Sequence, residues 1–156
     1  MGAHNTNDQD KSQPMSTEDN KNIVRRYQEA YNTANYEALA EVVATDVRTP
    51  NIVSGMSPGL EGAIAVHQTT LLGMPDYLTT IEDLIAEGDK VVARVTMTGT
   101  HTGDFWGVPP TGRRVNLTAI YIVRIADGKI VEHWGEEDGM KVFRQLGFKL
   151  KLEKLA

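Results

Sequence analysis

Three histidines and one acidic run are the side chains after the polar N-terminal tail that we select as candidates for proton exchange with a ligand. They are His67, His101 and His133, and the run Glu136, Glu137 and Asp138. An imidazole titrates near neutral pH, and burial raises the pKa of a carboxyl group. Either kind of group can therefore take a proton from a carbon beside a carbonyl, which is the chemistry we expect here.

The strand expected over residues 129–135 decides which of these groups could meet a ligand. Alternation along it places Val131, His133 and Gly135 on one face. The opposite face then holds Ile130, Glu132 and Trp134. We interpret His133 as the first candidate for the acid or base; the alternative is an imidazole that is hydrogen-bonded to a neighbouring strand.

Two further histidines and one methionine lie on apolar faces. His101 ends an expected strand and shares its face with Met97, so it could polarise a carbonyl group of a ligand or equally cap the backbone of the following loop. His67 lies on the apolar face of an expected helix, where a satisfied core histidine is more common than a ligand contact. All three remain candidates for the lining of an interior site.

The acidic run allows two interpretations. Three successive acids usually form a solvated turn or a helix N-terminus. The sharper hypothesis is that one of them turns into the interior as a general base, and strand parity favours Glu137 for that role.

Aromatic side chains could complete a binding site. Tyr31 and Tyr121 offer phenol donors for an enolate oxygen, or simply fill space with one partner each. Phe105 and Trp106 lie in the glycine- and proline-rich stretch 99–115, where they could cover a flat apolar ligand, anchor the loop or form a subunit contact.

Helices are expected in the first half of the chain. Residues 16–19 are a helix-start signal, and the apolar residues between 23 and 34 recur with helical spacing. A second helix is expected after Asn35, with Leu39, Val42 and Val43 facing inward. Residues 47–53 are expected to be extended, and a third helix is expected from about residue 60 to residue 71.

From residue 77 the apolar period changes to two. Strands are expected over residues 77–86, 90–101, 114–125 and 129–135, with Asp127 and Gly128 in a hairpin turn. Residues 136–146 are expected to add a turn of helix. This order predicts an α+β fold in which three N-terminal helices pack on a strongly curved, mainly antiparallel sheet, forming a cone that encloses a cavity.

Composition bounds the remaining possibilities. The 156 residues are 40% hydrophobic and 24% charged, as in one ordinary globular domain over residues 16–156, after a flexible polar tail over residues 1–15 that includes His4. The net charge of −5 argues against a nucleic-acid partner, and the apolar runs are too short to span a membrane. Without cysteine, metal-ligand spacing or a cofactor motif, we expect no metal and no cofactor. A cytoplasmic location fits this composition.

Three stretches resemble the SnoaL-like polyketide cyclase family, within the nuclear-transport-factor-2-like (ketosteroid-isomerase-like) superfamily. They are Y-Q-E-A-Y-N at residues 27–32, P-P-T-G-R at residues 109–113, and D-G-K-I-V-E-H-W with R-Q-L-G between residues 127 and 147. The resemblance implies a cone with a cavity and frequent homo-oligomers. It also implies cofactor-free chemistry, in the best-known members the intramolecular aldol closure of an aromatic polyketide ester.

The resemblance departs from the family at the acid/base position. The family's aspartate falls at Gly135 in this sequence, and the histidine one strand away falls at Tyr121. Because glycine cannot accept a proton, the family mechanism does not transfer unchanged. A tyrosine that lines the family's pocket matches Tyr31, and Asp138 matches a second acidic position, which makes Asp138 the first choice for a replacement carboxylate.

We therefore expect a cofactor-independent enzyme of the cyclase, isomerase or lyase type, acting through an enolate on a small apolar carbonyl compound. The alternatives are a non-catalytic small-ligand-binding protein, which Gly135 favours, and a cofactor-free hydroxylase-like branch. A homodimer or higher homo-oligomer is expected from the family. The candidate lining residues are Tyr31, His67, Met97, Phe105, Trp106, Tyr121 and Gly135.

Overall fold

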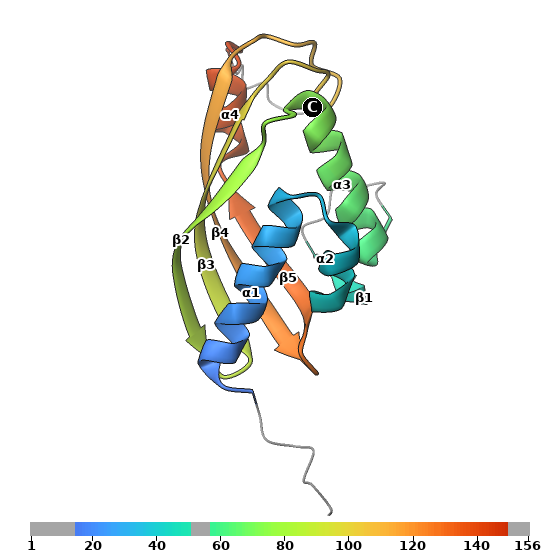
Figure 1. Ribbon diagram of the computed structural model, residues 1–156. Helices are drawn as coiled ribbons and strands as arrows, with labels where there is room; N and C mark the ends of the chain where they lie inside the picture. Colours follow the sequence, from blue (N-terminus) through green and yellow to red (C-terminus); the bar gives the residue numbers. More distant parts are fainter. Residues whose placement is uncertain (1–14, 51–56, 150–156) are drawn as a thin grey trace, which may run out of the picture.

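The computed structural model describes residues 15–50 and 57–149 and has four helices and five strands there. In chain order the elements are α1 (Thr17–Asn32), α2 (Tyr36–Val42), β1 (Val43–Arg48), α3 (Gly59–Gly73), β2 (Leu78–Glu87), β3 (Lys90–Thr100), β4 (Arg114–Ala126), β5 (Lys129–Glu137) and α4 (Gly139–Gln145). The three N-terminal helices lie together on one face of the sheet, which bends around them (Figure 1). The expected α+β fold is confirmed, and α4 adds a short helix at the end of the sheet, against β4.

The five strands form one sheet in the order β1-β5-β4-β3-β2. All neighbours are antiparallel except β1 and β5, which run parallel. Along β4 every second residue from Val115 to Ile125 is buried, which is the alternation of a sheet with one covered face. The turn into β5 has positive φ at both central residues, 49° at Asp127 and 74° at Gly128, as a two-residue hairpin requires.

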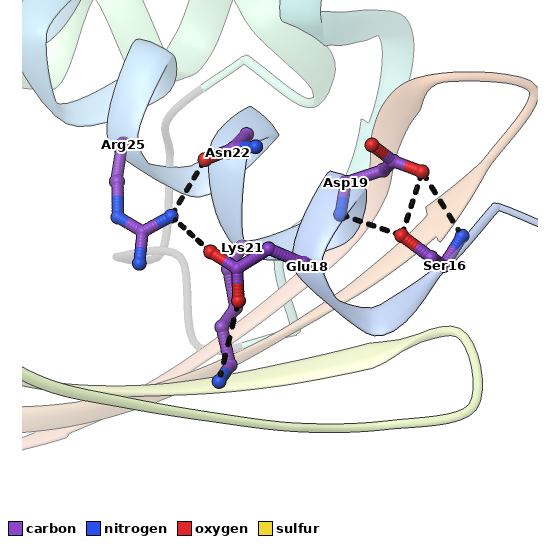
Figure 2. A network of polar contacts seen from close by, with 6 residues as sticks. All are labelled: Ser16, Glu18, Asp19, Lys21, Asn22 and Arg25. Atoms are coloured by element: carbon purple, nitrogen blue, oxygen red, sulfur yellow. Dashed lines mark hydrogen bonds and ion pairs between the residues drawn. The ribbon is translucent and has the colours of Figure 1, made fainter.

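Helix α1 begins where its sequence signals predict. The Ser16 hydroxyl accepts a hydrogen bond from the Asp19 backbone N–H at 3.1 Å, while the Asp19 carboxylate accepts from the Ser16 N–H at 3.2 Å (Figure 2). One turn further, Arg25 donates to Glu18 and Asn22 on the exposed side of the helix (Figure 2). These contacts leave the opposite side of α1 to face the sheet.

The start of β1 corrects one prediction. Val43 does not continue the second helix, because it pairs with Ile130 as the first residue of β1. It is buried all the same, at 4% exposure. A local apolar pattern indicates burial but not the pairing with a strand far along the chain.

Two clusters of buried residues make up the core. The larger lies between α1, α2 and the sheet and includes Val24, Leu39 and Val123. The smaller, which includes Met74, Leu117 and Leu146, ties the end of α3 and helix α4 to β4. Met97 is partly buried against both clusters, so it marks their junction.

Some predictions fall outside the described residues. These are the polar tail up to residue 14, the extended piece over residues 51–53, and the end of the chain from residue 150. Among the helices of the described ranges, none is long and apolar enough to cross a membrane.

Candidate functional site

The candidate site lies on the inner face of the sheet, where β4 and β5 bring three pairs of residues together. Pairing places Tyr121 opposite Gly135, Val123 opposite His133, and Ala119 opposite Glu137. Directly opposite residues of an antiparallel pair point to the same face, and Tyr121, Val123 and Ala119 are all buried against the helices. His133, Gly135 and Glu137 therefore face inward, as parity predicts.

For Ile130 the parity prediction, which placed it on the face opposite His133, is wrong because β5 has a bulge. The register shifts between Arg124 and Ile125, so that Ile125 pairs with Ile130 while Arg124 pairs with Glu132. The extra residue, Val131, turns Ile130 inward, where its exposure falls to 1%.

His133 is packed between two phenol rings. Its ring stacks on that of Tyr121 with the centroids 5.0 Å apart, and lies 6.1 Å from that of Tyr27. Burial lowers the pKa of His133 from 6.5 to about 4. The imidazole is therefore neutral at pH 7, where it can donate from one nitrogen and accept at the other, but it is a weak base.

Two tyrosines of α1 supply hydroxyl groups to the same interior. Tyr27 and Tyr31 are four residues apart, so they share one side of the helix, with ring centroids 5.8 Å apart. Burial is the largest cause that raises the pKa of each phenol well above 10, and neighbouring tyrosines are the next. Both phenols therefore remain protonated. Both side chains are half-buried, and within the described ranges neither hydroxyl has a hydrogen-bond partner. They are free to donate to a ligand.

Glu137 places a carboxyl group at the rim of this interior. The residue is exposed at the end of β5, yet partial burial of its carboxyl group raises the pKa. Burial is the main reason why the pKa values of Tyr31 and Tyr77 are raised, and the charge of Glu137 adds a smaller contribution to both. The carboxylate therefore lies within electrostatic reach of both phenols. Its carboxylate has no hydrogen bond or ion pair to the side chain or backbone of another described residue.

Asp138 has a different task. Its side chain accepts a hydrogen bond from the Lys141 backbone N–H at 3.0 Å, and so it caps the N-terminus of α4. Asp138 is therefore a helix cap, and Glu137, the alternative that strand parity favours, is the acid of the run that lies at the rim of the interior.

Gly135 leaves space beside the imidazole. A Cβ atom added there would lie 3.7 Å from Cε1 of His133 and 3.9 Å from Cβ of Tyr121, both ordinary contacts. The residue has no positive φ, so its backbone does not require glycine. A side chain is therefore compatible with this position.

His67 and Met97 fill the far side of the interior. His67 is 1% exposed, Tyr31 stacks on its ring at a centroid distance of 3.7 Å, and its Nδ1 lies 3.2 Å from the Tyr36 hydroxyl. The Met97 sulfur accepts from the Tyr77 hydroxyl at 2.7 Å. His67 therefore holds Tyr31 in place, in keeping with the core interpretation.

His101 braces the loop that follows β3. It is fully buried, its Nδ1 lies 3.0 Å from the Thr111 hydroxyl across the loop, and Nε2 has no partner in the described part of the chain. Phe105 packs edge-on to it at a centroid distance of 6.1 Å, whereas Trp106 is 44% exposed at the loop tip. These contacts fit the loop-anchoring alternative better than a ligand contact.

Metal ligands and open hollows do not define this site. No group of three or more potential metal ligands occurs within residues 15–50 and 57–149. One hollow of about 460 Å³ lies between β1 and the start of α3, and one of about 480 Å³ lies at the end of β5, lined by residues that include Arg94, Ile120, Glu136 and Glu137. Neither is lined by a tyrosine or a histidine, but Glu137 lines the second hollow, so of the candidate residues only this acid borders an open hollow among these two.

Sequence reasoning missed Tyr27, Gln28 and Tyr77. The spacing of Tyr27 and Tyr31 was a usable signal, because residues four apart on a helix face the same way. Gln28 gave no such signal, since a polar side chain next to Glu29 is expected on the exposed side of an amphipathic helix. Tyr77 lies just before β2, so strand parity does not say which way its side chain points. Its ring lies 6.5 Å from that of His67.

Comparison with known proteins gives a consistent result. The model of the SnoaL-like polyketide cyclase family matches residues 21–146. The chain is 35% identical over 129 residues to aklanonic acid methyl ester cyclase DnrD of Streptomyces peucetius, which covers 80% of this chain and 88% of that protein.

Solved structures agree. TsrD of Streptomyces laurentii superposes with a TM-score of 0.78 at 32% identity, covering 85% of this chain and 98% of that one. IdmH of Streptomyces antibioticus gives a TM-score of 0.73 at 35% identity, covering 83% and 99%.

Proposed function

Because the chain belongs to the SnoaL-like polyketide cyclase family, we propose that it closes a ring in an aromatic polyketide ester by an intramolecular aldol reaction, without a cofactor. The observation that supports this proposal is a carboxyl group with a raised pKa, Glu137, at the end of β5 and two residues from Gly135, so that strand parity assigns both to the same face. The family's base would stand at Gly135, and Glu137 lies one side-chain repeat along the same face, about 7 Å away.

Glu137 acts as the general base in this proposal. Its carboxylate removes a proton from a carbon that is activated by neighbouring carbonyl groups, which leaves an enolate. The enolate carbon then attacks a second carbonyl of the same molecule, so a carbon–carbon bond forms and the carbonyl π bond opens to an alkoxide. The proton held by Glu137 returns to that oxygen, and no atom is gained or lost.

The tyrosines and His133 stabilise the charge that develops on oxygen. Tyr27 and Tyr31 have unused hydroxyl groups that stay protonated, so they can donate to an enolate oxygen at neutral pH. A neutral His133 can donate from a ring nitrogen in the same way. Donors that are already oriented need little reorganisation as the charge forms.

A non-catalytic binding protein is the second candidate, and Gly135 favours it. Without the family's aspartate, the same interior would hold a flat carbonyl compound through the tyrosines and His133. The relative named above acts on aklanonic acid methyl ester, so this compound is a suitable probe for both functions.

The deciding experiment is turnover of aklanonic acid methyl ester, followed by liquid chromatography with mass detection. We expect ring closure by the wild type and a rate about 100-fold lower for Glu137→Gln. Glu136→Gln is the matched control, because Glu136 lies next in sequence but points to the outer face. Equal rates for the wild type and Glu137→Gln would place the base elsewhere. Saturable binding without turnover would support the binding protein.

A further inference from the structure

A chain of buried and half-buried polar side chains runs from the backbone of β2 to the ring of His133. Asn32, the last residue of α1, accepts at Oδ1 from the Thr79 backbone N–H at 3.0 Å and donates from Nδ2 to the Thr79 carbonyl at 2.8 Å. Gln28 donates from Nε2 to the same Oδ1 at 3.3 Å. The Tyr121 hydroxyl donates to Gln28 Oε1 at 2.7 Å.

The direction of every bond in this chain follows from the backbone of Thr79. A peptide N–H can only donate and a carbonyl can only accept, so the two ends of the Asn32 amide have no freedom to exchange. Oδ1 of Asn32 must then receive an N–H from Gln28, which turns Oε1 of Gln28 toward Tyr121. The phenol can satisfy Oε1 only by donating its own proton.

Tyr121 consequently has no proton to offer a ligand, but its ring is held at both ends. The backbone of β4 fixes one end and Gln28 fixes the hydroxyl. The residue opposite Tyr121 on β5 is Gly135, so no side chain covers the phenol there, and its ring stacks on the diagonal neighbour His133 at 5.0 Å with the planes 30° apart.

We infer that Gln28 is a positioning residue that orients His133 through Tyr121, which gives the proposed cyclisation a fixed donor. This role rests on the proposed function only for its effect on catalysis. The geometry does not depend on any substrate: Gln28 is 6% exposed, it makes no hydrogen bond to Glu137 or His133, and its amide connects the helix to the tyrosine that the histidine stacks on.

The direct test is nuclear magnetic resonance of the His133 imidazole, with Gln28→Met and Tyr121→Phe compared with the wild type. Each substitution breaks the chain at a different bond and keeps an apolar side chain of similar size in the core. We expect the pKa of His133 to rise by about 1 from its value of about 4 in both variants, because a mobile ring admits water. The tautomer ratio, read from the two ring nitrogens, should also move toward that of free imidazole.

Asn20→Ala is the matched control for general loosening. Asn20 is also a buried polar residue of α1 and donates to the Gly88 carbonyl at 3.0 Å, but it lies two turns before Gln28. An unchanged His133 in Gln28→Met and Tyr121→Phe would overturn the inference. An equal change in Asn20→Ala would also overturn it, because any loss of stability would then suffice.

If aklanonic acid methyl ester is turned over, Gln28→Met should lower kcat about 10-fold and leave KM within about 2-fold, since the donor is misoriented while the ring surface persists. If no turnover is found, the imidazole spectra still decide the inference. Failure of the positioning role and failure of the proposed function therefore give different results.

Discussion

The ring of Tyr31 lies on the ring of His67, with centroids 3.7 Å apart and planes inclined by 31°. The contact joins α1 to α3, and the Tyr36 hydroxyl of α2 holds the imidazole through Nδ1 at 3.2 Å. Burial lowers the pKa of His67, so the neutral ring is favoured. The position of Tyr31, a proposed donor, depends on this buried histidine.

Removal of that support should be costly. We expect His67→Ala to lower the free energy of unfolding by about 2–4 kcal/mol, because it leaves a void under Tyr31 and an unpaired Tyr36 hydroxyl. Urea denaturation measures the change. Leu72→Ala, on the same helix but 73% exposed, should stay within about 0.5 kcal/mol. A loss of under 1 kcal/mol for His67→Ala would contradict the bracing role.

Gly135→Asp should fold normally, since the added Cβ meets only ordinary contacts. Its carboxylate would enter beside His133 and raise the pKa of the imidazole from about 4 by favouring the charged ring. A resonance titration of His133 measures this, and Gly135→Asn supplies the same shape without the charge. A pKa that rises equally in both variants would show that charge is not the cause.

Activity should depend on pH through Glu137. Burial raises the pKa of this carboxyl group, so the rate should fall as the pH drops through that raised pKa, because a protonated carboxyl group cannot take a proton. The pH profile of kcat/KM for aklanonic acid methyl ester tests this. Loss of the acidic limb in Glu137→Gln would support the assignment, and an unchanged limb would refute it.

Stability should respond to the same group with the opposite sign. The unfolded chain loses the Glu137 proton first as the pH rises, so this group's contribution is full at low pH and falls through the raised pKa. Glu137→Gln should therefore gain stability relative to the wild type at pH 8 and none at pH 4. Urea midpoints at the two pH values provide the measurement.

His133 should make the fold sensitive to acid. Its pKa is lowered, so its contribution is complete above pH 6.5 and is lost as the pH falls toward 4, where the unfolded chain binds the proton first. The span from 6.5 to about 4 corresponds to about 3 kcal/mol. His133→Phe keeps a ring and should flatten the stability profile between these pH values; equal slopes would disprove this origin.

The strands that pair locally could be predicted from the sequence, whereas long-range pairing could not. Alternation in β3 and β4 and the turn at Asp127 are properties of neighbouring residues, and the structure confirms them. The pairing of Val43 with Ile130 and the bulge at Val131 depend on strands that meet only in the folded chain.

The candidate site shows the same division. Parity alone predicted that His133 and Glu137 face inward, because the side chains of a strand alternate regardless of its partner. The capping role of Asp138 and the chain through Gln28 could not be predicted, since both depend on backbone groups that lie near these side chains only after folding. Family likeness favoured Asp138, but local geometry favours Glu137.

The parallel pairing of β1 with β5 also sets an order of events during synthesis. β1 is made early, but its only neighbour in the sheet is β5, near the end of the described chain. While β5 is still inside the ribosome, the backbone of β1 has no strand to pair with, and the apolar residues of β1 have no assembled sheet in which to pack. We therefore expect the nascent chain to stay open to proteases and chaperones until β5 has emerged, and then to close in one late step.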